Sequence, residues 1–119
     1  MQRLWIGLGA LAGLLAVAMA AVAAHALPDL GAAHRAVVDS ALRMQGWHAL
    51  ALLACGLWRE RGGVLVDAAG ATFTAGILLF CGAVYGLALG GAATGPVAPA
   101  GGMLLMAGWV LLGLSALRR

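Results

Sequence analysis

Four long apolar stretches occupy most of this 119-residue sequence, and they constrain its fold more than any motif does. They run over residues 4–26, 44–58, 68–89 and 99–117. A helix needs about 20 apolar residues to cross the roughly 30 Å hydrocarbon core of a bilayer, and three stretches reach that length. The second is shorter, but the half-polar residues 30–43 before it can extend it. We therefore predict four transmembrane helices.

The composition supports the same class of protein. Hydrophobic residues make up 64% of the chain and charged residues 9%, with a mean hydropathy of +1.02. A soluble domain of this size could not bury so much apolar surface. The length suits a single domain, residues 1–119, so the predicted fold is an all-α, four-helix antiparallel transmembrane bundle.

Residues 30–43 have an amphipathic pattern that the four spans lack. Arg35, Asp39 and Arg43 follow one another at intervals of four residues, so opposite charges can pair along one helix face. The pattern predicts a short amphipathic helix lying in the membrane interface and leading into the second span, with a lipid-binding role as the alternative. After the second span, Asp67 is a candidate N-cap for the third helix.

The seven basic residues are all arginines, and they are distributed unevenly. If the helices alternate in direction, one side of the membrane holds five of them: Arg3, Arg59, Arg61, Arg118 and Arg119. Excess arginine in short loops marks the cytoplasmic side, so both termini are predicted to be cytoplasmic. The arginines lie at helix ends and do not cluster on one face, which argues against a nucleic-acid partner.

Glycines recur at helical spacing in the first and third spans, at Gly9 and Gly13 and at Gly82, Gly86 and Gly90. Lipid provides no hydrophobic drive for helices to associate, so small residues that allow close backbone approach often mark the contact. We predict that both sets form packing seams within the bundle. An oligomer interface is the alternative for the set in the third span.

Few polar side chains fall at membrane depth, and four of them form a candidate site: His25, Gln45, His48 and Tyr85. Counting about 1.5 Å per residue from the predicted helix ends places all four in one layer near the outer face. We therefore expect His25 and His48 within about one side-chain length of each other. Trp109 is expected farther down, toward the cytoplasmic half.

Three interpretations of this layer are open. The favoured one is a structural clasp, in which imidazole, amide and phenol groups hydrogen-bond to each other and fix the helix register. The second is a metal or haem site, which lacks a third ligand and any metal-ligand spacing motif. The third is a small-molecule or proton pathway through the histidines and the tyrosine. We predict no metal and no cofactor.

Catalytic groups and paired thiols are both poorly supported by the sequence. No serine stands beside a base and no carboxylate falls within a span, so we predict that the protein is not an enzyme. Cys55 and Cys81 lie in different spans at similar depths, where free thiols acting as small apolar side chains are favoured over a disulfide.

Four segments together resemble a known family. They are AHAL at residues 24–27, QGWHALALL at 45–53, GILLFCGAVY at 76–85, and PAGG at 99–102 followed by Gly108-Trp109. The chain resembles the small membrane proteins of domain of unknown function 423, which include the eukaryotic transmembrane protein 256. A serine is usual in that family where Cys81 stands here.

The resemblance implies a four-helix inner-membrane protein in bacteria, without an established reaction, substrate or cofactor. The family's recurring polar positions correspond to His25, Gln45, His48 and Tyr85. Two functions therefore remain: a structural or accessory protein that associates with itself or with a larger membrane complex, which we favour, and a binder or carrier of a small solute, lipid or metal at the polar layer.

Overall fold

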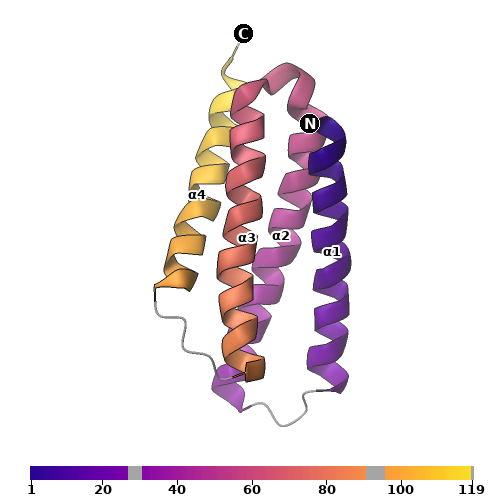
Figure 1. Cartoon of the computed structure of the whole chain (residues 1–119), viewed down its shortest axis with the longest axis vertical. Helices are drawn as coiled ribbons and strands as arrows, with labels where there is room; N and C mark the ends of the chain where they lie inside the picture. Colours follow the sequence, from indigo (N-terminus) through magenta and orange to yellow (C-terminus); the bar gives the residue numbers. More distant parts are fainter. Residues whose placement is uncertain (27–30, 91–95, 119) are drawn as a thin grey trace.

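The computed structural model describes residues 1–26, 31–90 and 96–118 of the chain. These residues form four helices, α1 (Gln2–His25), α2 (Ala32–Gly62), α3 (Val64–Gly90) and α4 (Val97–Ala116). The helices run antiparallel along one axis, and both termini lie at the same end as the α2–α3 turn (Figure 1). An all-α bundle is therefore confirmed.

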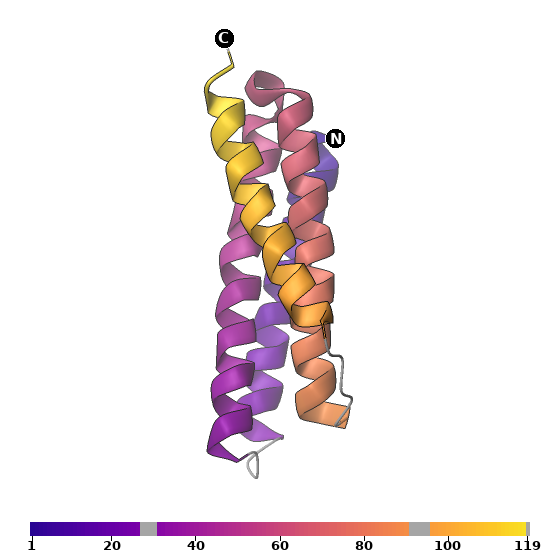
Figure 2. The same ribbon diagram turned by 90° about the vertical axis from the view of Figure 1, so that its left-hand side faces the viewer.

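The bundle consists of two helix pairs. α1 packs mainly on α2 and α4 mainly on α3, while the interface between α2 and α3 joins the pairs. α4 leans across α3 and has a much smaller contact with α2 (Figure 2). Gly63, with φ of 63°, ends α2 and lets α3 begin at the next residue, because glycine adopts positive φ without steric strain.

The separate interfacial helix predicted over residues 30–43 is absent, and this prediction was wrong. Residues 32–43 are the first three turns of α2, which continues unbroken to Gly62. No proline or glycine lies between Ala32 and Gln45, so nothing in the sequence stops the helix there. Val38 and Ala41 are buried against the neighbouring helices, which ties this half-polar segment to the bundle.

Three of the helices, α1, α3 and α4, are long and apolar enough to cross a membrane. α2 is not among them, and it carries charged side chains both in its first half and in its last turns. It packs against both α1 and α3. Many large apolar side chains point outward, and Leu14, Val17, Leu57, Leu78 and Val110 are each more than 60% exposed. Such a surface suits lipid, and the chain is a multi-pass membrane protein.

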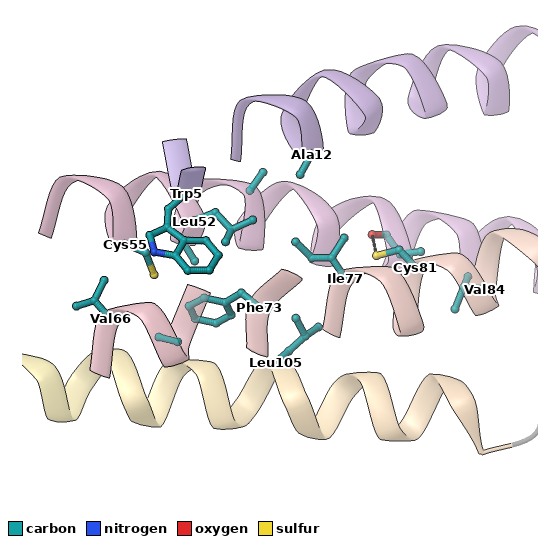
Figure 3. Packing of buried hydrophobic residues seen from close by; sticks show 14 residues of the cluster. Trp5, Ala12, Leu52, Cys55, Val66, Phe73, Ile77, Cys81, Val84 and Leu105 are labelled. Atoms are coloured by element: carbon teal, nitrogen blue, oxygen red, sulfur yellow. Dashed lines mark hydrogen bonds between the residues drawn. The ribbon is translucent and has the colours of Figure 1, made fainter. Parts of the chain in front are cut away.

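The core is built from apolar side chains that follow the bundle axis from Val66 to Val84, with Phe73 and Leu52 among the fully buried ones (Figure 3). Glycines allow the helices to approach closely. A Cβ added at Gly9 would lie 2.8 Å from the carbonyl oxygen of Ala49 in α2. The predicted role of Gly9 in a packing seam thus matches the structure.

The α3 glycines predicted as a second internal seam do not lie inside the bundle. A Cβ added at Gly82, Gly86 or Gly90 would meet no described atom within 4 Å. The contacts with α4 use other glycines: a Cβ at Gly76 would lie 2.6 Å from Leu105, and one at Gly101 would lie 2.4 Å from the backbone nitrogen of Phe80. Glycine spacing located a stripe on α3 but not the direction in which the stripe faces.

Candidate functional site

Gln45 on α2 links the helices on either side of it through its amide group. The side chain is 5% exposed. Its Nε2 donates a hydrogen bond to the backbone carbonyl of Ala12 on α1 at 2.9 Å, and its Oε1 accepts one from the hydroxyl of Tyr85 on α3 at 2.8 Å. Because unpaired polar groups are costly in a membrane interior, these bonds fix three helices in register. We call this group the Gln45–Tyr85 clasp.

His48, one turn further along α2, forms a second polar group. Its Nε2 accepts a hydrogen bond from Nε1 of Trp109 on α4 at 3.0 Å, and its Nδ1 bonds to the carbonyl of Met44. A carbonyl can only accept, so Nδ1 must carry the proton. The imidazole is thereby assigned as the neutral Nδ1–H tautomer with both nitrogens in use. We call this group the His48–Trp109 clasp.

Phe73 on α3 completes the second clasp through aromatic contacts. Its ring centroid lies 5.6 Å from that of His48 and 5.2 Å from that of Trp109, and the Phe73 and Trp109 rings meet edge to face. Gly108 makes this approach possible, because a Cβ there would lie 2.5 Å from the Phe73 ring. Edge-to-face pairs add roughly 0.5–1.5 kcal/mol beyond burial. The contacts hold α4 against α2 and α3.

His25 does not join either clasp, contrary to the sequence-based prediction. It is the last residue of α1 and is exposed. Thirteen residues separate it from Ala12, which marks the level of Gln45, and this corresponds to about 20 Å along the helix. The prediction failed because α2 begins at Ala32, so His48 lies 16 residues inside the helix rather than near its start.

Trp109 belongs to the second clasp, although the sequence analysis did not include it in the candidate site. It was expected in a lower layer than His48, and the two meet because His48 lies deeper than predicted. One signal could have identified the pair. Trp109 carries one of the few polar side chains of α4, and an indole N–H inside a membrane needs an acceptor, although the Trp109 side chain as a whole is 48% exposed.

Asp67 forms a third polar contact at the end of the bundle that holds the termini. Its Oδ1 accepts hydrogen bonds from Trp5 Nε1 at 2.9 Å and from Arg59 Nε at 2.7 Å. The predicted N-cap role was wrong, since α3 already begins at Val64 and places Asp67 in its first turn. The carboxylate instead connects α1, α2 and α3, close to the positive end of the α3 dipole.

Thiols and other metal-ligating groups do not gather in the part of the chain that the structure describes. Cys55 and Cys81 are buried and unpaired with each other, as the sequence predicted. The Cys81 thiol donates to the carbonyl of Ala41 at 3.5 Å. Among residues 1–26, 31–90 and 96–118, no group of three histidine, cysteine or acidic side chains is placed to hold a metal ion.

A groove opens between α1 and α3 beside the Gln45–Tyr85 clasp. Its volume is about 410 Å³, and Gln45 from α2 lies among its lining residues. The other lining residues are apolar or small, apart from the Cys81 thiol and the Tyr85 hydroxyl: Leu15, Ala18, Met19, Val22, Ile77, Leu78, Cys81, Gly82 and Tyr85. The groove has room for a small molecule and lies directly against the Gln45–Tyr85 clasp.

The fold and these contacts define a class: a small polytopic helical membrane protein whose helices are joined by buried side-chain hydrogen bonds. Residues 19–102 match the family model described as "Protein of unknown function (DUF423)", and the chain belongs to that family.

Curated relatives match over almost the whole chain. A UPF0382 membrane protein of Staphylococcus epidermidis is 35% identical over 98% of each chain. A UPF0382 membrane protein of Haemophilus influenzae is 34% identical over 94% of this chain and 92% of its own. The UPF0382 inner membrane protein YgdD of Escherichia coli is 32% identical over 98% and 92%. No solved structure matches the chain.

Proposed function

We propose that this protein is a structural or accessory component of the bacterial inner membrane that associates laterally with a second transmembrane surface, either another copy of itself or a larger membrane complex. The observation that carries the proposal is the outward direction of the α3 glycines Gly82, Gly86 and Gly90. We call these three residues the α3 glycine ridge.

The α3 glycine ridge has no use inside the described bundle. A glycine within a helix is destabilising by roughly 0.5–1 kcal/mol relative to alanine. Other glycines, such as Gly76 and Gly101, offset that cost by allowing close contact with α4. Three glycines at four-residue intervals on an outer face would offset it in the same way if a helix of another molecule packed there.

The state of the interior polar groups supports a structural role over a catalytic one. In the described part of the chain, every buried side-chain nitrogen and oxygen has a hydrogen-bond partner. Both nitrogens of His48 are engaged, so its imidazole has no lone pair ready to accept a substrate proton. Groups that each have at least one partner are suited to fixing the helix arrangement on which an outer contact surface depends.

The inner-membrane location and the orientation are part of the same proposal. The Escherichia coli relative is an inner membrane protein. Arg3, Arg59, Arg61 and Arg118 lie at the end of the bundle that carries both termini, and that end is proposed to be cytoplasmic (Figure 1). Labelling of a Glu60→Cys variant in intact cells tests this orientation, because Glu60 is exposed near the same end of α2. An impermeant thiol reagent applied from outside should leave the variant unmodified, and modification would reverse the orientation.

Gly86→Ile tests the association, with Gly113→Ile on α4 as its matched control. A Cβ at either position meets no described atom within 4 Å, so both variants should fold as the unchanged protein does. Native mass spectrometry of protein released from native membranes in mild detergent should show a complex for the unchanged protein and for Gly113→Ile, and mostly free subunits for Gly86→Ile. An equal yield of complex from both variants would contradict the proposal.

A second candidate function is supported by the groove between α1 and α3. Binding of a small membrane-soluble molecule there would use the polar layer as a recognition group rather than only as a clasp.

A further inference from the structure

The groove extends beyond the 410 Å³ section described above. A narrower section of about 100 Å³ continues it along α1 to Leu8 and along α3 to Thr74, and both sections share Gln45 in their lining. From Leu8 to Val22 the groove follows α1 for about 21 Å, at 1.5 Å per residue. One leaflet of the hydrocarbon core is roughly 15 Å thick. The groove can therefore hold an extended apolar chain.

The amide of Gln45 retains hydrogen-bonding capacity at the floor of this groove. Its Nε2 carries two N–H groups, and one donates to the carbonyl of Ala12. Within the described ranges the other N–H has no acceptor. The hydroxyl oxygen of Tyr85 donates its proton to Gln45 and can still accept. A side chain that is 95% buried in a membrane interior thus presents a donor that plain hydrocarbon cannot satisfy.

The lining restricts the polar end of any ligand. No charged side chain lines either section of the groove, so a carboxylate or phosphate would have no counter-ion there. A neutral carbonyl oxygen matches the free N–H, and an apolar chain matches the walls formed by residues such as Leu15 and Leu78. We infer that the groove between α1 and α3 is a binding site for a neutral, membrane-soluble molecule that combines an apolar chain with a carbonyl acceptor placed against Gln45.

Two kinds of membrane molecule offer this chemistry: the acyl ester of a neutral glycerolipid and the carbonyl of an isoprenoid quinone. The inference goes beyond the lateral association proposed above and is tested at different residues. Gly82 belongs to both the groove and the α3 glycine ridge, so the test instead uses Ala18, an exposed lining residue of α1. Ala18→Phe fills the groove and leaves Gly86 unchanged.

The experiment titrates the purified, delipidated protein in mild detergent with four probes and counts bound molecules by native mass spectrometry. Dioleoylglycerol and menaquinone-4 carry neutral carbonyls, oleate carries a charge, and hexadecane has no polar group. We expect one bound molecule of at least one carbonyl probe, and the tighter of the two identifies the source. Ala18→Phe should weaken that binding at least tenfold. Ala20→Phe, which places the same ring at an exposed α1 position outside the groove lining, should not.

Gln45→Met separates recognition by the amide from occupation of an apolar groove. It should weaken binding of the carbonyl probe about three- to tenfold, the factor contributed by one hydrogen bond inside a membrane, and leave hexadecane unaffected. Three results would overturn the inference: hexadecane or oleate binding as tightly as the carbonyl probes, Ala20→Phe weakening binding as much as Ala18→Phe, or no bound carbonyl probe. None of them bears on the complex disrupted by Gly86→Ile.

Discussion

Replacing Trp109 by phenylalanine should destabilise the bundle through a single lost hydrogen bond. The substitution keeps an aromatic ring beside Phe73 but removes the indole N–H that donates to Nε2 of His48 at 3.0 Å. His48 is only 3% exposed, and its other nitrogen already bonds to the carbonyl of Met44. No second donor is available to Nε2 among the described residues, so the acceptor is left unpaired.

The size of the effect follows from that burial. Leaving a buried acceptor unsatisfied costs roughly 1–3 kcal/mol in proteins generally. Side-chain hydrogen bonds within membranes average about 0.6 kcal/mol and reach about 1.7, because the unfolded state in the membrane also finds partners. The two ranges overlap at about 1–1.7 kcal/mol, which is the loss we expect for Trp109→Phe.

Reversible unfolding in mixed micelles, titrated with a denaturing detergent, measures this free energy. Trp47→Phe is the matched control, since Trp47 lies on the outer face of α2 and is 57% exposed. Its free energy of unfolding should change by less than about 0.5 kcal/mol. A double-mutant cycle with His48→Phe isolates the pair and should give a coupling of about 0.6–1.7 kcal/mol. Equal effects of Trp109→Phe and Trp47→Phe, with no coupling, would refute the reasoning.

Two further substitutions test the helix contacts by the same unfolding measurement. Tyr85→Phe removes the hydroxyl that donates to Gln45 and should cost about 0.6–2 kcal/mol; no change would show that the Gln45–Tyr85 clasp contributes nothing to stability. Gly101→Ala places a Cβ 2.4 Å from the backbone nitrogen of Phe80, so α3 and α4 must separate at a cost of roughly 1–3 kcal/mol. Gly102→Ala, whose Cβ would lie 3.9 Å from the Phe80 ring, should be tolerated, and similar losses for the two alanine variants would contradict the close packing.

The helical architecture was predictable because apolar run length alone determines which segments can cross a bilayer. The start of α2 was not, because residues 32–43 alternate between charged and apolar side chains and fit an interfacial helix equally well. What decides the matter is the burial of Val38 and Ala41 against other helices, which is a tertiary effect. The continuous helix then moves Gln45 and His48 inward by several turns relative to His25.

The site was only partly predictable, because the depth of each polar residue depends on where its helix begins and ends. Gln45 and Tyr85 do meet as expected, although depth was counted from the outer helix ends and the start of α2 was misplaced. They meet because the single-residue turn between α2 and α3 leaves them at similar distances along their helices. His25 was misplaced because the second span was assumed to begin at residue 44. α2 begins at Ala32 instead, so about three more helical turns separate His48 from the level of His25. The partner of His48 was misjudged for the same reason, and the outward direction of Gly82 depends on α4, which occupies the opposite face of α3.

The central claim is that the α3 glycine ridge contacts another transmembrane helix. Disulfide cross-linking in native membranes tests it most directly, with one cysteine introduced at Gly86 or, as the control, at Gly113. Both positions are open, and the native Cys55 and Cys81 are buried. We predict that mild oxidation converts Gly86→Cys, but not Gly113→Cys, into a disulfide-linked dimer if the partner is a second copy of the chain. If the partner is another membrane protein, a benzophenone maleimide attached to the same introduced thiol should give a discrete photo-adduct, because that reaction needs no thiol on the partner. If Gly86→Cys stays monomeric in both reactions, or cross-links no more than Gly113→Cys, the ridge faces lipid and the proposed association is wrong.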